Sequence, residues 1–287
     1  MHSIARYEPY LYLLPAISIL CVFLLFPFAW NIYISTHGVS ITTILKEWEF
    51  VWLDNFIQVL NDPNFHTSIK ISIIFVGGSV VFQFLIGLVI ASLLNQNIKG
   101  KQILIALIMI PWITSGLIAA FSFKFIFDNS FGIINYILEY LGFSAVAWLS
   151  DPKIVVWSII IANVWYGTPF TILFLTAGLL SINPSIYEAA VIDGATKFRS
   201  FLRITLPLLK PFIVINLILI TMWSVNFFDL QLVMTGGGPL FASTTASLYM
   251  YRQAFEFGLL SKGAAAGLIL IIINISVAFV YLKLLKR

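Results

Sequence analysis

Charged residues are scarce in this sequence of 287 residues. They make up 10% of the chain, against 60% apolar residues, whereas a soluble domain carries roughly 25% charged residues. This composition excludes an ordinary soluble protein, and the 26 phenylalanines exclude an intrinsically disordered one. Cys21 is the single cysteine of the chain, so a disulfide scaffold is excluded as well.

The sequence also lacks the motifs of common enzymes. It contains neither the G-x-x-x-x-G-K-[ST] loop that binds nucleotides nor the G-x-S-x-G nucleophile elbow. Its three histidines are scattered outside the apolar stretches, which does not favour a histidine-based metal site. We therefore expect no catalytic residue, no metal site and no cofactor bound by this chain itself.

Six long apolar stretches dominate the sequence. Each is close to the roughly 20 residues that a helix needs to cross about 30 Å of hydrocarbon. Backbone groups in lipid must be hydrogen-bonded internally, and the stretches are too long for barrel strands. The sequence thus predicts an all-α polytopic membrane protein, one domain over residues 1–287, with lipid as its main solvent. The expected spans are about 10–34, 69–94, 103–127, 154–180, 211–234 and 264–285.

The first stretch could also be a cleaved signal. Its apolar run exceeds the roughly 7–15 residues of a signal core, and no clear cleavage site follows it. We therefore expect a permanent first helix.

Basic residues gather in alternate connecting segments. With a cytoplasmic N-terminus, the inner segments hold ten basic and three acidic residues, a net charge of +7, and the outer segments hold six basic and nine acidic residues, a net charge of −3. Because basic residues mark the cytoplasmic side, we expect both termini to be cytoplasmic. The overall charge of +4 then reflects topology and contact with an anionic leaflet, not nucleic-acid binding.

The longest inner loop, residues 181–211, has the pattern of a helix, a turn and a second helix. Asn183 can cap the first helix, and Gly194 can end it in the left-handed conformation. Pro207 and Pro211 are expected to end or kink the second helix before the fifth span. On these grounds alone the loop is either a well-capped surface loop or a docking element for a cytoplasmic partner.

The pattern Glu188-Ala189-Ala190-x-x-Asp193-Gly194-Ala195, followed by Phe201 and Pro207, resembles the EAA loop of ATP-binding-cassette importer permeases. In that family the loop docks into a cleft of an ATPase subunit. The resemblance implies that two carboxylates contact basic groups of the ATPase, that a glycine makes the turn, and that alanines allow close approach. The coupling residues implied are Glu188, Ala189, Ala190, Asp193, Gly194, Ala195, Phe201 and Pro207.

After the fifth span, the stretch Thr235-Gly236-Gly237-Gly238-Pro239 is similar to that of carbohydrate-uptake permeases of the maltose and glycerol-phosphate type, the first of the two paired permeases. Two interpretations remain open for it. In the first, the glycine backbone, which has no side chain, approaches sugar or a binding protein at the outer end of the transport path. In the second, the stretch is a flexible turn that ends a broken helix. The residues concerned are Gly236, Gly237, Gly238 and Pro239.

The resemblance implies a permease subunit of an ATP-driven, binding-protein-dependent sugar importer in a prokaryotic plasma membrane. Its implied partners are a second sugar permease, two ATP-binding-cassette ATPase subunits that hold Mg-ATP, and an extracellular sugar-binding protein. Two alternatives stay open. One is a secondary transporter or channel that works without an ATPase, and the other is a membrane subunit that only anchors a cytoplasmic partner.

Polar and aromatic residues of the fourth and fifth spans are candidates for the sugar path, since sugars are held by hydrogen bonds and aromatic faces. The alternative is that the aromatic residues pack helices or lie in the interfacial belt, as we expect for Trp112. We expect Gln83 to bond across helices. Trp223, Asn226 and Phe227 are spaced to share one helix face. The candidates are Asn163, Trp165, Tyr166, Trp223, Asn226, Phe227, Asp229 and Gln231.

Overall fold

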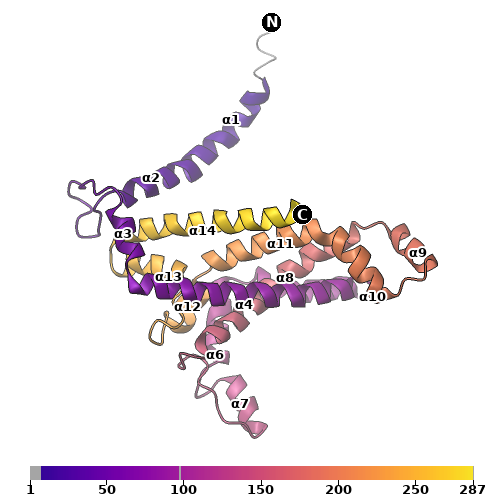
Figure 1. Ribbon diagram of the computed structural model, residues 1–287. Helices are drawn as coiled ribbons and strands as arrows, with labels where there is room; N and C mark the ends of the chain where they lie inside the picture. The colour runs from indigo at the N-terminus through magenta and orange to yellow at the C-terminus, as the bar shows by residue number, and fades with distance from the viewer. Residues whose placement is uncertain (1–7, 97, 287) are drawn as a thin grey trace. The chain divides into compact units, whose positions relative to one another are not determined.

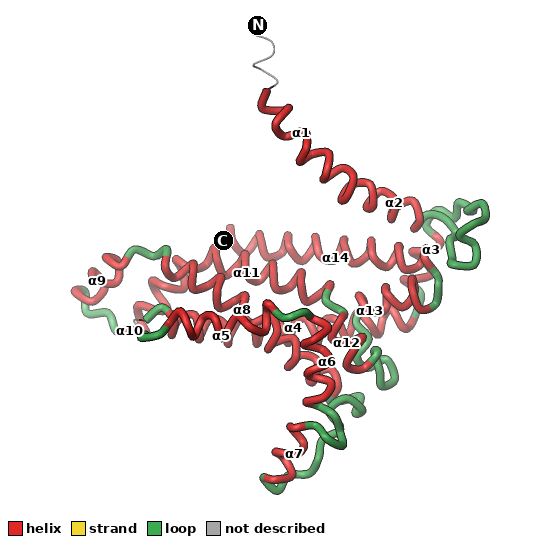
Figure 2. The backbone as a smooth tube through the Cα atoms, turned by 180° about the vertical axis from the view of Figure 1, so that it is seen from behind, coloured by secondary structure: helices red, strands yellow, loops and turns green. Residues whose placement is uncertain are grey.

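The computed structural model describes residues 8–96 and 98–286. Over these residues the chain is helical, with no strand beyond an isolated bridge between His37 and Phe50 (Figures 1 and 2). The all-α prediction is confirmed. The elements, with η marking π-helical turns, are α1 (Glu8–Leu20), η1 (Cys21–Leu25), α2 (Phe26–Ser35), α3 (Asp54–Leu60), α4 (Pro63–Leu94), α5 (Lys101–Ile113), α6 (Gly116–Ile126), α7 (Ile133–Tyr140), α8 (Val155–Leu180), α9 (Pro184–Ile192), α10 (Lys197–Ser200), η2 (Phe201–Thr205), α11 (Leu206–Asn226), α12 (Asp229–Thr235), α13 (Ala246–Tyr251), η3 (Arg252–Glu256) and α14 (Leu260–Lys286).

Five continuous helices of the described chain are long and apolar enough to cross a membrane, and α5 with α6 makes a sixth span if this bent pair is counted as one. The structure therefore agrees with a polytopic fold of up to six spans. The continuous spans are Tyr12–Ser35, Pro63–Leu94, Val155–Leu180, Lys197–Asn226 and Leu260–Lys283.

The third apolar stretch is not the single helix expected over 103–127. It breaks between α5 and α6, whose axes differ by 91°. Thr114 and Ser115 are extended at the break, with ψ angles of 146° and 139°. Pro111 lies in the last turn of α5 and has no N–H for the helical ladder. Thr114 Oγ1 donates to the carbonyl of Ile110 at 2.7 Å, so the helix end is partly satisfied locally.

Two π-helical turns explain how the chain continues through prolines. η1 and η2 each precede an α-helix whose second residue is proline, Pro27 in α2 and Pro207 in α11. In both places the residue before the proline donates five residues back, from Phe26 to Cys21 and from Leu206 to Phe201. The wider turn shifts the hydrogen-bond ladder where proline cannot donate. Of the two outcomes expected for Pro207 and Pro211, an end to the second helix is wrong, because α10, η2 and α11 form one continuous span; a kink stays a prediction.

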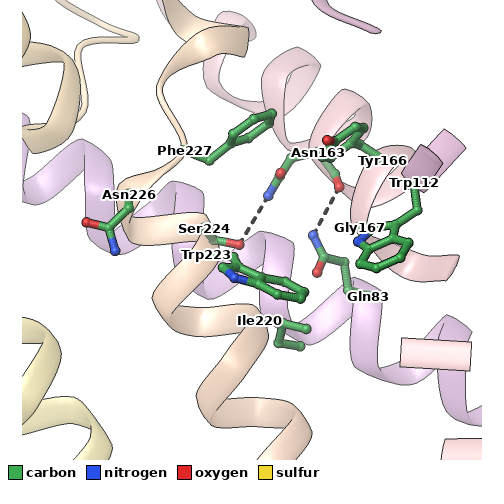
Figure 3. A pocket seen from close by; sticks show the side chains of 10 residues that line it. All are labelled: Gln83, Trp112, Asn163, Tyr166, Gly167, Ile220, Trp223, Ser224, Asn226 and Phe227. Carbon is green, nitrogen blue, oxygen red and sulfur yellow. Dashed lines mark hydrogen bonds between the residues drawn. The ribbon is translucent and has the colours of Figure 1, made fainter. Parts of the chain in front are cut away.

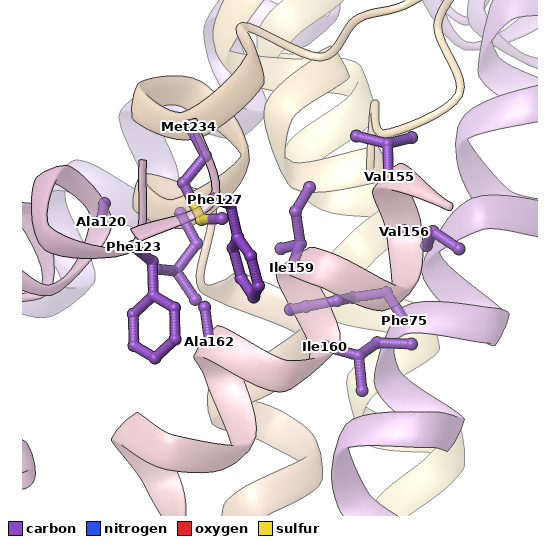
Figure 4. Packing of buried hydrophobic residues seen from close by; sticks show 11 residues of the cluster. Phe75, Ala120, Phe123, Phe127, Val155, Val156, Ile159, Ile160, Ala162 and Met234 are labelled. Atoms are coloured by element: carbon purple, nitrogen blue, oxygen red, sulfur yellow. The ribbon is translucent and has the colours of Figure 1, made fainter. Parts of the chain in front are cut away.

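A large buried cluster joins α4, α6, α8 and α12 (Figure 4). Its members include Phe75 of α4, Ile160 of α8, Phe123 of α6, Phe127 and Met234 of α12, and each is less than 10% exposed. Apolar side chains gain little from leaving lipid, so helices in a membrane associate through close packing. The cluster places α12, which follows the break in the fifth span, against α6, which follows the break in the third.

Glycines bring α4 close to α8. A Cβ added at Gly78 would lie 2.8 Å from Ile160 Cδ1, and one at Gly87 would lie 2.4 Å from Thr171 Cγ2. Neither distance leaves room for a side chain. Small residues of this kind let membrane helices approach each other.

The described chain divides into two compact units by its internal packing. One unit comprises Met1–Phe65 and Tyr249–Ile271, and the other comprises His66–Leu248 and Ile272–Arg287. In the first unit the Tyr249 hydroxyl donates to Asp62 Oδ2 at 2.7 Å. Burial, followed by the hydrogen bond and charge of Asp62, raises the pKa of Tyr249, so this phenol stays protonated as the donor.

Candidate functional site

The second unit contains a hollow of about 430 Å³ (Figure 3). It lies among α4, α5, α8 and α11, and the extended residue that follows α11 completes its wall. The residues that line it are Gln83, Trp112, Asn163, Tyr166, Gly167, Ile220, Trp223, Ser224, Asn226 and Phe227.

Three buried polar side chains form a hydrogen-bonded chain along the hollow. Gln83 Nε2 donates to the carbonyl of Asn163 at 3.0 Å, and Asn163 Nδ2 donates to Ser224 Oγ at 3.3 Å. All three residues are 5% exposed or less. In the described part of the chain no group donates to Gln83 Oε1 or Asn163 Oδ1. The hollow therefore keeps two amide oxygens that can accept hydrogen bonds from hydroxyl groups.

Aromatic rings form the other walls of the hollow. Tyr166 and Phe227 stack with their centroids 5.1 Å apart and their planes 7° apart. Trp112 lies 6.3 Å from Trp223, and Phe170 meets Trp223 edge to face at 4.5 Å. Flat apolar faces beside hydrogen-bonding groups suit a ligand with an apolar face and hydroxyl edges, which is the chemistry of a sugar ring.

The break after α11 positions Phe227. The helix ends at Asn226, and Phe227 is extended with φ −86° and ψ 106°. The expectation that Trp223, Asn226 and Phe227 share one face of a continuous helix is therefore wrong, although all three line the hollow. Gly116 makes room for the turned ring, since a Cβ there would lie 2.8 Å from Phe227 Cε2.

Five of the eight candidates for the sugar path line the hollow, and three lie elsewhere. Trp165 is 43% exposed and meets Phe123 edge to face at 5.4 Å. Asp229 is half-buried in the first turn of α12, and Gln231 is fully buried in the same helix. The five that line the hollow are Asn163, Tyr166, Trp223, Asn226 and Phe227.

Sequence reasoning missed five lining residues. Gln83 bonds across helices as expected, yet it also faces the hollow. Trp112 lines the hollow as well as packing against other rings. Gln83 and Ser224 could have been identified from the sequence, because each is a polar residue inside an apolar span. Gly167 and Ile220 have no such signal in the sequence.

The loop between α8 and α11 folds as a helix, a turn and a helix, and we call α9, α10 and the turn between them the elbow. Asn183 Oδ1 accepts from the Ser185 N–H at 3.0 Å and caps α9. Gly194 ends the first helix with φ +74°. Thr196 Oγ1 accepts from the Arg199 N–H at 3.3 Å and caps α10. These caps satisfy backbone groups at the helix ends, so the elbow has a defined structure and is not an irregular loop.

The elbow exposes large apolar side chains beside carboxylates. Val191, Ile192 and Phe198 are 70%, 86% and 73% exposed. Glu188 and Asp193 are exposed nearby, and within residues 8–96 and 98–286 neither takes part in an ion pair. Such a surface is suited to contact another protein with complementary charge.

The other predicted coupling residues form the body of the elbow and its junction with α11. Tyr187 Oη and Thr205 Oγ1 lie 3.0 Å apart and join α9 to η2, which contains Phe201. This bond ties the elbow to the start of the fifth span. Of these residues, Ala190 is buried, Ala195 and Phe201 are half-buried, and Ala189 and Pro207 are exposed.

The glycine-rich stretch is held by hydrogen bonds. Gly236 and Gly237 have φ angles of +59° and +84°. Ser243 Oγ donates to the carbonyl of Gly238 at 2.5 Å, and Thr244 Oγ1 donates to that of Gly237 at 2.9 Å. Gly236 ends α12, and Pro239 follows the glycines. The stretch therefore has a defined shape, and its approach to sugar or a binding protein stays a prediction.

Comparison with known proteins gives concordant matches. Residues 83–287 match the family described as the binding-protein-dependent transport system inner membrane component. Over 96% of its length the chain is 38% identical to the trehalose/maltose transport system permease protein MalF of Thermococcus litoralis, and it covers 92% of that protein. It is 33% identical to the sulfoquinovosyl glycerol transport system permease protein SmoG of Agrobacterium fabrum, over 96% of this chain and 89% of that one.

Solved structures share the fold. A bacterial ABC transporter involved in the import of the acidic polysaccharide alginate contains a chain that matches with a TM-score of 0.83 and 24% identity, covering 100% of this chain and 98% of that chain. The bacterial alginate ABC transporter in complex with an alginate pentasaccharide-bound periplasmic protein matches with the same TM-score, covering 98% and 94%. The predicted fold class is confirmed by these matches.

Proposed function

The chain belongs to the family of binding-protein-dependent transport system inner membrane components, and we propose that it is the sugar permease subunit of an ATP-driven importer. The resemblance that the sequence showed to importer permeases is confirmed by this membership. The relatives compared above are permeases of a trehalose/maltose system and a sulfoquinovosyl glycerol system. Their names support a sugar or a related glycoside as the substrate class.

The observation that carries this proposal is the mixed lining of the hollow. Two acceptor oxygens, from Gln83 and Asn163, lie between aromatic walls that include the stacked Tyr166 and Phe227. A chain that only anchored a cytoplasmic partner would not require such a hollow. We propose that the sugar passes through it during transport, with hydroxyl groups donating to the amide oxygens.

The elbow supports the proposed coupling to an ATPase. The chain carries no nucleotide-binding loop, so the energy of ATP must enter through contact with another subunit. We propose that Glu188 and Asp193 face basic groups of the ATPase while Phe198 fills an apolar site on it. Mg-ATP would then be held by two ATPase subunits, and this chain would hold no cofactor and catalyse no reaction.

The remaining partners follow from the same proposal. A second permease would form the other half of the path, and an extracellular binding protein would deliver the sugar near the loop of Gly236–Pro239. The charge asymmetry of +7 against −3 supports cytoplasmic termini and a cytoplasmic elbow. The chain itself is a multi-pass inner-membrane protein.

Uptake by the purified complete complex tests the proposal. The complex is reconstituted in vesicles that contain Mg-ATP, and the binding protein is added outside with radiolabelled maltose, trehalose or sulfoquinovosyl glycerol. We expect uptake of at least one of these compounds with ATP inside, and none with a non-hydrolysable analogue. Uptake that follows a proton or sodium gradient and ignores ATP would instead establish a secondary transporter.

A further inference from the structure

Two hollows meet where α4 approaches the elbow. One, of about 340 Å³, lies between the end of α4 and the elbow and is lined in part by Asn95 and Lys197. The other, also of about 340 Å³, runs along α4. They share the lining residues Ser92, Gln96 and Phe201. The two hollows are therefore adjacent, and together we call them the α4 groove.

The elbow end of the α4 groove contains polar side chains beside apolar ones such as Leu179 and Val191. Asn95, Gln96, Lys197 and Ser200 line it. Lys197 is exposed, and no ion pair involves it in the part of the chain that the structure describes. A cation beside amide and hydroxyl groups matches a phosphate with its ester oxygens.

The opposite end of the α4 groove is apolar. Leu85, Val89 and Leu93 follow one another at four-residue spacing along α4 and are 50%, 60% and 52% exposed. From Leu85 to Leu94, where α4 ends, the helix rises about 14 Å. This is close to half of the roughly 30 Å hydrocarbon thickness, the depth that one leaflet occupies.

We propose that the α4 groove binds an anionic phospholipid of the cytoplasmic leaflet. Its phosphate would lie at Lys197, and one acyl chain would lie along Leu85, Val89 and Leu93. This placement rests on the proposed function, which puts the elbow on the cytoplasmic side. A soluble partner could not reach the apolar end within the hydrocarbon, and an apolar helix of another subunit would leave the polar end unmatched.

Lipid in the α4 groove would contact two separate parts of the chain. The polar end is formed partly by α10 and η2, which lead into the fifth span, and the apolar end belongs to α4. A bound lipid would therefore hold the base of the elbow against α4. Lipid composition would in this way affect how firmly the elbow is positioned.

Native mass spectrometry of the complete importer complex tests the proposal. The delipidated complex in detergent is titrated with phosphatidylglycerol and, separately, with phosphatidylcholine of the same acyl chains. Two variants address the two ends, Lys197→Glu and Val89→Trp. Two matched controls lie outside the groove lining, the exposed cation Arg199→Glu and the exposed α4 residue Ile86→Trp.

The wild-type complex and both controls should bind phosphatidylglycerol more tightly than phosphatidylcholine. Lys197→Glu should weaken phosphatidylglycerol binding roughly fivefold or more and remove the preference. Val89→Trp should weaken binding of both lipids. Phosphatidylglycerol binding by both variants that equals that of the controls would overturn the proposal.

A co-purification assay for the ATPase separates this proposal from the proposed function. Loss of the ATPase in Lys197→Glu with unchanged phosphatidylglycerol binding would make the polar end a protein-docking surface and would refute the lipid site alone. Failure of ATP-driven uptake by the wild-type complex would refute the proposed function, whatever the lipid titration shows.

Discussion

Gly167 controls the position of the Gln83 amide. A Cβ added at Gly167 would lie 2.7 Å from Gln83 Nε2 and 2.8 Å from its Oε1. An alanine would therefore push the amide aside and break its bond to the Asn163 carbonyl. Loss of a buried hydrogen bond costs on the order of 1–3 kcal/mol.

We expect Gly167→Ala to lower the rate of sugar uptake at low sugar concentration and to leave assembly of the complex intact. Gly77→Ala is the matched control, because a Cβ there would meet no described atom within 4 Å. Uptake is measured over a range of sugar concentrations in ATP-loaded vesicles. Identical uptake curves for Gly167→Ala and Gly77→Ala would show that the Gln83 amide has no part in the path.

For single residues, the sequence showed which side chains are polar within an apolar span, but it did not show where those side chains lie in the fold. Asn163 and Tyr166 stand out as polar residues in an apolar span, and both line the hollow. Asp229 and Gln231 stand out in the same way but lie in α12, outside the lining. A one-dimensional pattern cannot show where a helix breaks, and the break after Asn226 decides which of these residues face the hollow.

Among the elements, the elbow depends on the backbone at Gly194. Its φ of +74° is left-handed, and no described atom lies within 4 Å of where its Cβ would be. A side chain at this position would therefore have enough space, and only the left-handed backbone conformation restricts which residues are tolerated. A β-branched residue is strongly disfavoured there, at a cost of roughly 1–2 kcal/mol, whereas asparagine tolerates this conformation.

We expect Gly194→Val to change the angle between α9 and α10 and to abolish most ATP-driven uptake. Gly194→Asn should retain it, although both side chains enter the same open space. Membrane insertion should be normal in both, since neither change touches a span. The comparison uses the amount of ATPase that co-purifies and uptake in vesicles. Equal loss in the valine and asparagine variants would mean that the side chain itself blocks a contact, and that conformation is not the cause.

The caps of the elbow were predictable because capping is local chemistry. Asn183 and Gly194 take the roles expected of them.

The breaks and π-helical turns were not predictable in this way. Pro27 and Pro207 follow π-helical turns that let their helices continue, whereas Pro111 precedes a sharp break. Proline removes one donor in each case, and the surrounding packing decides whether the helix widens or ends.

For the whole molecule, the sequence predicted the fold class because apolar length is a strong signal in membranes, although it missed the breaks in the third and fifth apolar stretches. It could not predict the division into two compact units, which arises from the packing of distant segments, such as those that carry Asp62 and Tyr249. It also could not predict the α4 groove, whose two ends come from α4 and from residues about 100 positions further along the chain.

We expect a reporter protein inserted near Ser200, or fused after Arg287, to be cytoplasmic, and one inserted near Gly142 to be external. The net charges of +7 and −3 on the two sides are the reason. Accessibility of the reporter in intact cells is the measurement. A cytoplasmic reporter at Gly142 would reverse the topology and place the elbow on the wrong side for an ATPase.

Coupling through the elbow is tested most directly by photo-crosslinking in the intact complex. A photoreactive phenylalanine analogue replaces Phe198 of the elbow or, as a control of similar size and exposure, Tyr136 of α7. Their side chains are 73% and 68% exposed. We predict that irradiation links the analogue at Phe198 to an ATPase subunit and that the analogue at Tyr136 gives no such product. No ATPase adduct from Phe198, or the same adduct from both positions, would contradict the proposal that the elbow is the site of coupling.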